Sequence, residues 1–564
     1  MHGVKVGCFG LLASRQLLSQ TNSLSCCIRG AACVQELFYN VVGRQTSTAT
    51  SEPVIIRVPR RMQDRMDSVK QVKRKNLDKV ATVKAGRLLI ESKNTKLNQS
   101  VSYTLGKFEE PVLTSKAWKN NKSFGDYFTI NSTQSAPPFL PESKEEKNQD
   151  GQNPRNTFSH LRLSSELVET LQSHNITHPT IVQLQTIPKL LRGHNVLCAA
   201  ETGSGKTLAY LLPMVQKLHT EMRPIELESE QKTQALVLVP SRELAEQVTS
   251  VARAVSQPFG LKVKVVGGGR GVGSIKAAFS YGQPDLLVAT PGSLLKAIWR
   301  RFVDLSELRF IVVDEADTMF DPSFVDMLEK VLRHTQVAAN LSELTGPTRK
   351  AQLVVVGATF PGGVGELLDK VTDLGSLVTV KSRMLHYLMP HVKQTFVKVR
   401  GSEKVLELHQ ALKEADRKGV LVFCNSAATV NWLGYTLEEM GLHHARLQGE
   451  MPASMREGIF QNFQKGHVDV LLCTDIASRG LDTQRVGLVV NYDFPESHTD
   501  YIHRAGRVGR AGASGGGHVL SFVTHPWDVE LVQSIETAAR RRMCLPGMET
   551  DIQKPSKTLS QESK

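Results

Sequence analysis

Carboxylates near the middle of the chain stand where they could do chemistry. Asp314 and Glu315 follow directly on the apolar run 311–313, and Asp317 comes two positions later. The apolar run predicts a buried parallel strand, so the acids should lie at the carboxyl edge of a sheet, where open α/β folds bind their ligands. One carboxylate at such an edge can hold a magnesium ion while its neighbour accepts a proton from an attacking water.

A phosphate-binding pattern precedes these acids in the chain. Residues 200–207 read Ala-Glu-Thr-Gly-Ser-Gly-Lys-Thr and follow another apolar run at 196–199. The glycines allow backbone N–H groups to close around phosphates, and Lys206 reaches the terminal phosphates. The Thr207 hydroxyl and the Asp314 carboxylate can then hold one Mg²⁺ between them. The predicted nucleotide-binding residues are Ala200, Glu201, Thr202, Gly203, Ser204, Gly205, Lys206 and Thr207.

Short apolar runs alternate with amphipathic stretches from about residue 158 onward. This alternation predicts parallel strands joined by crossover helices, the pattern of the α/β class. The runs form two sets, so we expect two tandem domains, at 157–386 and 387–545, that join near 385–394. The first set of expected strands lies at 195–199, 236–239, 263–266, 286–289, 309–313 and 353–356. The second set lies at 420–424, 444–447, 469–473, 488–491 and 518–523.

The chain is basic, with a formal charge of +14 over 564 residues, which favours a polyanionic partner such as nucleic acid. Much of this excess lies in residues 57–122, which hold seventeen Lys or Arg against six Asp or Glu. Two interpretations stay open: an arm that binds nucleic acid without choosing a sequence, and a solvated spacer. We expect residues 51–156 to form a basic, largely disordered extension and residues 546–564 a disordered tail.

The first 50 residues have the composition of a targeting segment, with Glu36 as the single acid and with frequent Ser and Thr. The basic residues there are Lys5, Arg15, Arg29 and Arg44. Leaders of this kind direct proteins into mitochondria, so residues 1–50 are predicted to be a transit peptide and the protein to reach the matrix. A leader without a targeting role is the alternative, and the basic extension also leaves the nucleus or nucleolus open. No apolar run approaches the roughly 20 residues of a membrane span, so no membrane insertion is expected.

Two further motifs carry a specific resemblance. Residues 240–245 read Pro-Ser-Arg-Glu-Leu-Ala, and residues 503–510 read His-Arg-Ala-Gly-Arg-Val-Gly-Arg. With the phosphate loop and the Asp-Glu-Ala-Asp run, and in this order, they make the segment from Phe158 to about Met543 resemble the DEAD-box ATP-dependent RNA helicases. Within that family the chain looks most like the vertebrate mitochondrial members whose motif III reads Gly-Ala-Thr. The resemblance implies two RecA-like domains that bind ATP and Mg²⁺ and close on RNA.

The resemblance also assigns roles around the nucleotide. Phe158 and Gln183 match the Q motif, in which the Gln amide would donate to and accept from the adenine edge. Asp482 matches a ribose contact, and Glu315 matches the general base for the attacking water. The implied catalytic residues are Lys206, Asp314, Glu315, His503, Arg507 and Arg510.

The second implied domain supplies residues that respond to closure. Arg507 and Arg510 match arginine fingers, which stabilise charge on the transferring phosphoryl group. His503 matches the residue that couples this motif to the carboxylates. The implied coupling residues of the first domain are Asp317, Gly357 and Thr359.

The implied RNA contacts are residues suited to sugar and phosphate oxygens, so they should position a strand without reading its sequence. In the first domain they are Pro240, Arg242, Gly268, Gly269, Thr290, Pro291 and Gly292. In the second they are Gly449, Arg456, Thr474 and Asp475.

Three positions depart from the family pattern. Ser293 replaces an arginine and Ala453 replaces a glutamine, which puts RNA affinity in doubt. Gly357 replaces the serine of the usual Ser-Ala-Thr motif, which puts coupling between the domains in doubt.

These features predict an RNA helicase and RNA-dependent ATPase that acts as a monomer. Family analogy suggests structured ribosomal RNA as its substrate, during assembly of the mitochondrial large subunit and alongside ribosome-assembly factors. An ATP-gated RNA clamp or assembly factor with little unwinding is the alternative, because of the three departures. A DNA translocase is a weaker one, which 2′-hydroxyl contacts would exclude.

Overall fold

The computed structural model places the central parts of the chain. It describes residues 87–106, 109–134, 157–220, 232–269, 271–345, 349–359, 368–369, 377–415, 419–456, 458–475, 483, 485–510 and 516–546. The predicted transit peptide, residues 547–564 of the predicted C-terminal tail and Asp482 lie outside the described residues.

The first sheet has seven strands in the order β10-β4-β9-β8-β5-β7-β6, and all neighbours run parallel. Its strands are β4 (Asn195–Ala199), β5 (Ala235–Leu238), β6 (Val263–Val266), β7 (Leu286–Ala289), β8 (Phe310–Val313), β9 (Gln352–Gly357) and β10 (Leu377–Lys381). The six strands predicted from apolar runs are confirmed. The seventh, β10, was missed because it lies at the sheet edge, and only Val380 of its five residues is buried.

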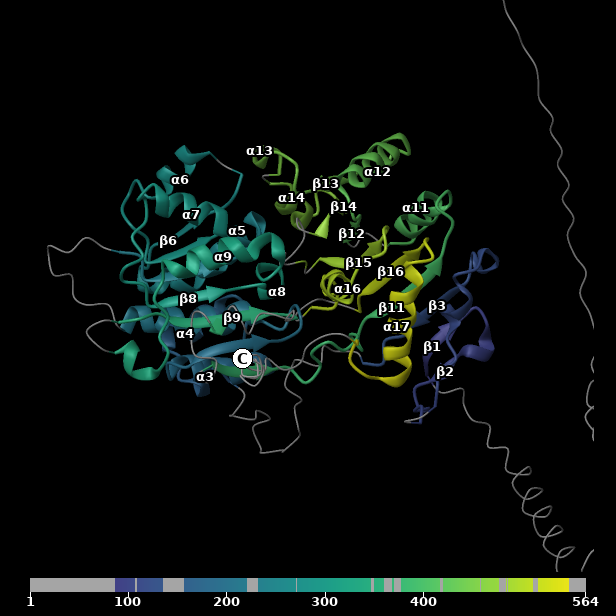
Figure 1. Ribbon diagram of the computed structural model, residues 1–564, viewed down its shortest axis with the longest axis horizontal. Coiled ribbons are helices and arrows are strands. Elements are labelled where there is room, and N and C mark those ends of the chain that lie inside the picture. Colours follow the sequence, from purple (N-terminus) through teal and green to yellow (C-terminus); the bar gives the residue numbers. More distant parts are fainter. Residues whose placement is uncertain are drawn as a thin grey trace, which may run out of the picture. The chain divides into compact units, whose positions relative to one another are not determined.

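Helices cover both faces of the first sheet (Figure 1), so its strands are buried on both sides and read as continuous apolar runs. One face packs against η5 (Phe158–Leu161), α2 (Ser165–Ser173), α3 (Ile181–Leu191), α4 (Lys206–Thr220), α5 (Arg242–Ser256) and η6 (Gln257–Phe259). The other packs against α6 (Val272–Ala278), α7 (Pro291–Trp299), α8 (Ala316–Met319) and α9 (Pro322–Arg333). The short η7 (Leu341–Leu344) follows α9.

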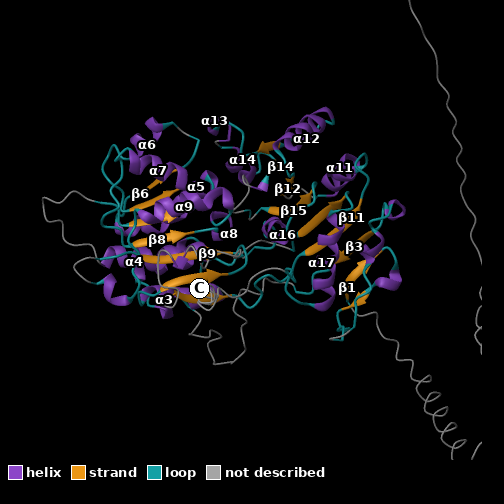
Figure 2. Cartoon of the chain, in the orientation of Figure 1, coloured by secondary structure: helices purple, strands orange, loops and turns teal. Residues whose placement is uncertain are grey.

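The second sheet is built around six parallel strands, again with helices on both faces (Figure 2). The strands are β11 (Lys393–Lys398), β12 (Gly419–Phe423), β13 (Ala445–Leu447), β14 (Val470–Cys473), β15 (Val486–Asn491) and β16 (His518–Val523). The helices are α11 (Lys404–Glu414), α12 (Ala427–Glu439), α13 (Ala453–Arg456), α14 (Ile459–Lys465), α16 (His498–Ala505) and α17 (Asp528–Arg541). Five of these strands were predicted, and β11 was not, because it lies partly within the stretch assigned to the join.

Three strands from the N-terminal part of the chain extend the second sheet to nine, in the order β13-β14-β12-β15-β16-β11-β3-β1-β2. They are β1 (Leu88–Ser92), β2 (Gln99–Ser100) and β3 (Tyr127–Ile130), with η1 (Thr95–Leu97), η2 (Thr114–Ala117) and η3 (Asn121–Ser123) between them. The strand β3 pairs antiparallel with β11, and β1 pairs antiparallel with β3. The predicted disorder of 51–156 is therefore wrong for residues 87–134, here called the N-terminal addition.

A buried ion pair fastens the N-terminal addition to the C-terminal helix α17. Glu536 is fully buried and accepts hydrogen bonds from the backbone N–H groups of Thr114 (2.8 Å) and Ser115 (3.0 Å). Arg540 lies 2.7 Å from the same carboxylate and donates to the backbone oxygen of Leu97 at 3.1 Å. The sequence hid this arrangement, because the three strands are only five, two and four residues long, and β3 joins the second sheet through β11, more than 250 positions away.

Two smaller observations concern cysteines and membrane spans. Cys198, Cys424 and Cys473 are buried free thiols, whereas Cys544 is partly exposed. None of the helices in the described residues has the length and apolar character that a membrane span requires.

Candidate active site

The phosphate loop, the acidic run and the Gly-Ala-Thr motif meet at one edge of the first sheet. Their strands β4, β9 and β8 are neighbours and run parallel, so all three motifs follow carboxyl ends at the same side (Figure 1). The backbone N–H of Ala200 donates to the oxygen of Gly357 at 3.1 Å. The sequence predicted that the motifs lie at a sheet edge, and the sheet order shows that their three strands are neighbours.

Lys206 lies folded within the phosphate loop at the start of α4. Its ammonium group donates to the backbone oxygens of Ala200 (2.7 Å) and Glu201 (2.9 Å), and the residue is only 8% exposed. Gly203 and Gly205 have φ of 78° and 84°, a conformation that residues with a Cβ rarely adopt. A lysine held in such a loop has the charge and the donors that a phosphate requires.

Thr180 and Gln183 of the Q motif support the phosphate loop by hydrogen bonds. The Thr180 hydroxyl donates to the oxygen of Ser204 at 2.8 Å, and the Gln183 amide donates to the oxygen of Gly205 at 3.0 Å. Gln183 also accepts from the backbone of Thr180 at 2.9 Å, which closes a capping box on α3. Each polar atom of the amide keeps capacity for one more hydrogen bond, so adenine binding by Gln183 stays a prediction. Phe158 is 2% exposed and packs in the core of the first domain.

Glu201 and Thr202 link the phosphate loop to other parts of the fold. The hydroxyl of Ser382, which follows β10, donates to the Glu201 carboxylate at 2.6 Å. The Thr202 hydroxyl donates to the backbone oxygen of Gly506 in the second domain at 3.3 Å. The phosphate loop is therefore hydrogen-bonded both to the segment that follows β10 and to the second domain. Neither partner could be found from the sequence.

Asp314 is held by a residue that the sequence did not single out. The Tyr210 hydroxyl donates to its carboxylate at 2.8 Å, and the backbone N–H of Glu315 donates to its other oxygen at 2.8 Å. Burial, and then the charge of Glu315, raise the pKa of Asp314 to about 6. Burial also raises the pKa of Tyr210 well above its usual range, so the phenol stays a donor. Tyr210 lies one helical turn after Lys206, and that spacing was the available signal.

Glu315 has the features of a catalytic base. It is 7% exposed, has a left-handed backbone with φ of 48°, and its Oε2 is buried and has no hydrogen-bond partner among the described residues. An unpartnered carboxylate oxygen beside a buried acid is suited to accept a proton or to orient a water. The donors offered by Thr207, Asp314 and Glu315 are all oxygen, which is what Mg²⁺ prefers.

Asp317 joins the first domain to the second. One carboxylate oxygen accepts from the Thr359 hydroxyl (2.9 Å) and the Thr359 backbone (3.2 Å), and it also lies 2.6 Å from Nε2 of His503. Burial opposes ionisation, but the charge and hydrogen bond of His503, with Thr359, outweigh it and hold the pKa of Asp317 below its usual range. The structure thus brings together the predicted coupling residues, while Gly357 contributes backbone only.

The arginines of the second domain follow His503 on and after α16. Arg504 is 1% exposed and forms a two-pronged pair with Asp475 at 2.7 and 2.6 Å. Arg507 is also buried and donates from Nε to the oxygen of His503 at 3.0 Å. Arg510 lies against the phosphate loop, because a Cβ added to Gly203 would be 2.8 Å from its Cγ. Both predicted fingers therefore stand close to the phosphate loop or to the coupling pair.

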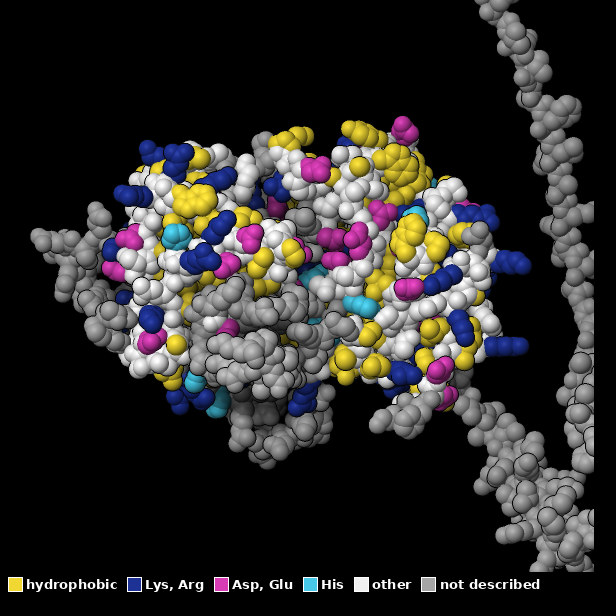
Figure 3. All heavy atoms as spheres, viewed as in Figure 1, with side chains coloured by type: hydrophobic (Ala, Val, Ile, Leu, Met, Phe, Trp, Pro, Cys, Tyr) yellow, Lys and Arg dark blue, Asp and Glu magenta, His cyan; other side chains and the backbone are white. Residues whose placement is uncertain are grey.

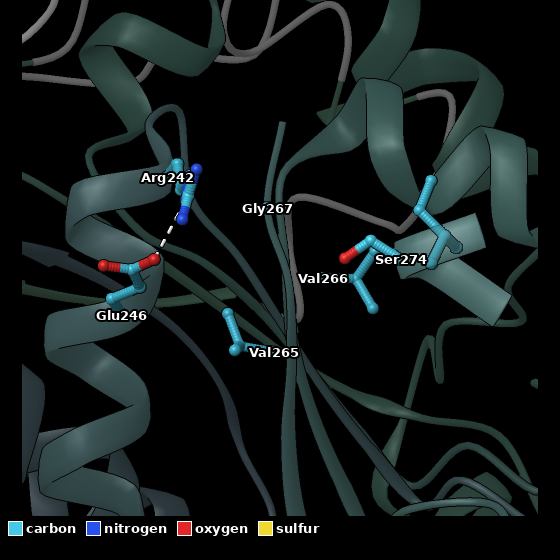
Figure 4. A pocket seen from close by; sticks show the side chains of 7 residues that line it. Arg242, Glu246, Val265, Val266, Gly267 and Ser274 are labelled. Atoms are coloured by element: carbon cyan, nitrogen blue, oxygen red, sulfur yellow. Dashed lines mark hydrogen bonds and ion pairs between the residues drawn. The ribbon is translucent and has the colours of Figure 1, made fainter. Parts of the chain in front are cut away.

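Arg242, a predicted RNA contact, lines a pocket beside the sheet edge (Figure 4). Its Nε pairs with Glu246 on the same helix at 2.9 Å, and the residue is 6% exposed. Gly267 makes room for it, since an added Cβ there would lie 2.7 Å from the Arg242 Cγ. The pocket opens between α5 and the end of β6, where Gly268 and Gly269 follow.

A second cross-domain pair involves Arg456, another predicted RNA contact. It lies 3.5 Å from Glu243 of α5, and both side chains are largely buried. Because Glu243 adjoins Arg242, the pair ties the two predicted RNA surfaces together.

The remaining predicted RNA contacts lie at strand ends. Thr290 begins α7, and its hydroxyl donates to Ser293, which stands where the family has an arginine. Pro291 and Gly292 form the first turn of α7, and Pro240 follows β5. Gly449 follows β13 and Thr474 follows β14. Asp475 pairs with Arg504, a contact that the sequence did not predict, and its contact with RNA stays a prediction.

Comparisons with known proteins agree with this geometry. The DEAD/DEAH box helicase family matches residues 180–367, and the helicase conserved C-terminal domain matches residues 403–512. The mouse protein named "Probable ATP-dependent RNA helicase DDX28" is 49% identical over 515 residues, covering 89% of this chain and 93% of that protein. The human protein of the same name is 47% identical over 527 residues, covering 90% and 95%.

Solved structures share the fold. Yeast Dbp5 bound to RNA and ADP BeF3 aligns with a TM-score of 0.58 and 24% identity, covering 68% of this chain and 93% of that one. The DEAD-box helicase Mss116 bound to ssRNA and UDP-BeF aligns with a TM-score of 0.59 and 21% identity, covering 69% and 78%. At these identities the likeness shows two tandem RecA-like domains.

Proposed function

This chain belongs to the DEAD-box family of ATP-dependent RNA helicases, and on that premise we propose that it couples ATP binding and hydrolysis to local, sequence-nonspecific opening of RNA duplexes or remodelling of RNA–protein complexes. It is an RNA helicase and ATPase, with ATP as its cofactor. The proposal concerns how the chain uses that activity and which residues carry it.

The observation that carries the proposal is the buried pair between Asp317 and His503. It joins the acidic run of one domain to the arginine-bearing motif of the other at 2.6 Å. A hydrogen bond to a charged group contributes about 1.5–3 kcal/mol, so this contact favours the closed arrangement substantially. Closure places the second domain against the phosphate loop, which makes hydrolysis depend on the joined domains.

Each group at the site has a role in this scheme. Lys206 binds the terminal phosphates, and Asp314 with Thr207 holds Mg²⁺, which neutralises phosphate charge when it is bound. Glu315 takes the proton of the attacking water through its unpartnered oxygen. Arg507, with Arg510 beside it, stabilises charge on the transferring phosphoryl group.

Two substitutions test the chemistry. Glu315→Gln should abolish turnover yet retain ATP and RNA, because it removes the base and keeps the shape of the site. Lys206→Ala should weaken ATP binding itself. The control is Glu329→Gln in α9, a half-buried residue that pairs with Arg333 of the same helix, and it should behave as wild type. Normal RNA-stimulated ATPase in Glu315→Gln would contradict the assignment.

The RNA path crosses both domains at the strand ends described above, and backbone contacts of this type read no sequence. The basic extension adds to it. Residues 57–86 carry ten Lys or Arg against three Asp, and Lys and Arg side chains also gather over the N-terminal addition (Figure 3). Each neutralised phosphate steepens the salt dependence of binding.

The test of the extension must spare the N-terminal addition, because its strands belong to the second sheet. Removing residues 57–86 from the chain should lower RNA affinity and flatten the slope of log K against log salt. ATPase at saturating RNA should change little. Equal slopes for the two proteins would contradict an RNA-binding arm.

An ATP-gated RNA clamp is the second candidate, and Gly357 is the observation that favours it. Its backbone binds the phosphate loop, but it has no hydroxyl to add to the coupling network. Strand displacement measured beside ATP-dependent RNA retention separates the two candidates. Retention without displacement would favour the clamp.

The setting we propose is the mitochondrial matrix, with structured large-subunit ribosomal RNA as the substrate and assembly factors as partners. The acid-poor leader supports the compartment. A reporter fused to residues 1–50 should enter mitochondria, and a cytosolic or nuclear reporter would contradict this. Crosslinking to RNA in fractionated cells would identify the substrate.

A further inference from the structure

A column of aromatic rings runs from the N-terminal addition to the helix that carries His503. Trp118 lies 5.6 Å from Phe128 between ring centroids, and Phe128 of β3 stacks on Phe396 of β11 at 4.8 Å with a 12° tilt. Phe396 in turn stacks on Tyr501 of α16 at 5.7 Å. The column therefore joins residues that lie almost four hundred positions apart in the chain.

Every ring in the column is fully buried. The Tyr501 hydroxyl donates to the side chain of Gln394 on β11 at 2.6 Å, which fixes its far end. Stacked aromatic pairs contribute beyond the area that they bury, and buried rings in such contacts have few alternative rotamers. The contacts thus hold Tyr501 at one place relative to the sheet.

The position of Tyr501 decides the position of the functional residues that follow it. His503 and Arg504 lie on the same short helix, and Arg507 is tied back to the oxygen of His503 at 3.0 Å. A shift of α16 would therefore move the partner of Asp317 and the predicted finger together. Preorganised groups lose much of their effect when they are displaced by even about 1 Å.

We infer that the N-terminal addition positions the arginine-bearing helix for hydrolysis, with Phe128 and Trp118 as positioning residues that act through Phe396 and Tyr501. The inference rests on the proposed role of Arg507 and His503 in hydrolysis. Nothing in the sequence of the addition itself resembles a catalytic motif. Its contribution comes from the ring contacts and from the anchor at Glu536.

The matched control is Phe522 of β16, in the same sheet. It is as deeply buried as Phe128, but it belongs to the cluster on the opposite face, where it contacts Tyr492 edge-on at 6.2 Å. Phe128→Leu and Phe522→Leu remove comparable rings from one domain, and only the first interrupts the column.

The test measures both variants in the full chain. Phe128→Leu should lower the RNA-stimulated kcat about tenfold with little change in the KM for ATP, because the phosphate loop lies in the other domain. Phe522→Leu should lower the melting temperature similarly and keep kcat within about twofold. Hydrogen exchange should become faster in residues 498–505 of Phe128→Leu only. The milder Trp118→Phe should have a kcat between those of the two variants. It replaces Phe128→Leu in the test if Phe128→Leu folds poorly.

Equal losses of kcat in Phe128→Leu and Phe522→Leu, or unchanged exchange in α16, would overturn the inference and leave the proposed function intact. A wild-type chain without RNA-stimulated ATPase would overturn the proposed function and this inference with it.

Discussion

Replacing Gly506 by alanine should keep the second domain away from the phosphate loop. A Cβ on Gly506 would lie 1.7 Å from the Thr202 hydroxyl oxygen and 2.9 Å from the Thr202 Cβ. Gly506 itself has φ of −66°, which any residue adopts, so the second domain alone should accept alanine. The nearest obstacle within that domain is the oxygen of Ile502 at 3.1 Å, which a small shift relieves. The substitution should therefore act only when the domains meet.

The size of the effect follows from these distances. The Thr202 hydroxyl can rotate away, but its Cβ is fixed to the loop backbone. Two carbon atoms prefer a separation of about 3.5–4.0 Å, so the surfaces must part by roughly 1 Å. A misplacement of that size can cost about 100-fold in rate. The hydrogen bond from Thr202 to Gly506 is lost as well, which removes about 0.5–1.5 kcal/mol from closure.

The assay compares RNA-stimulated ATPase, ATP affinity and melting temperature in full-length proteins. Gly506→Ala should lower kcat about 100-fold and leave the Kd for ATP near the wild-type value, because Lys206 belongs to the first domain. Gly516→Ala is the control, since among the described residues its Cβ would meet only the oxygen of His391, at 3.8 Å. Adding Thr202→Ala removes the closest clash and should restore part of the rate. A wild-type rate in Gly506→Ala would show that these residues do not meet during hydrolysis.

Three further outcomes are expected. Asp317→Asn should lower RNA-dependent hydrolysis at least about tenfold, because breaking one partner of a buried pair costs about 3–5 kcal/mol; wild-type turnover would show that His503 does not need the charge. Glu536→Ala should lower the melting temperature strongly and Glu536→Gln less so, because alanine leaves a buried arginine without its charged partner. Equal melting curves would contradict the role of Glu536 as an anchor. Burial lowers the pKa of His386 and His518 to about 4, whereas the pKa in the unfolded chain is about 6.5. The unfolded chain then binds more protons between these values, so stability should be full above pH about 6.5 and fall as the pH drops toward 4, and a flat profile of melting temperature would refute this.

Local patterns in the sequence were enough to predict eleven of the thirteen parallel strands that build the two sheets. Runs such as 286–289 are apolar throughout because a parallel strand covered by helices on both faces has no exposed side. The edge strand β10 and the interior strand β11 lack that signature, since part of each remains exposed. Each of these strands forms by pairing with a neighbouring strand, and the local sequence does not identify that partner.

The sequence by itself pointed to the groups that we propose to bind phosphate and carry out hydrolysis, because Lys206, Asp314 and Glu315 belong to local motifs at strand ends. Tertiary structure alone decided what holds them. Tyr210 reaches Asp314 and His503 reaches Asp317 only after strands and domains distant in sequence have packed. The same holds for residues 87–134, which were predicted to belong to a largely disordered extension. They are held by pairing with β11, more than 250 positions away, and by contacts with α17, and contacts between distant segments leave no local pattern to read.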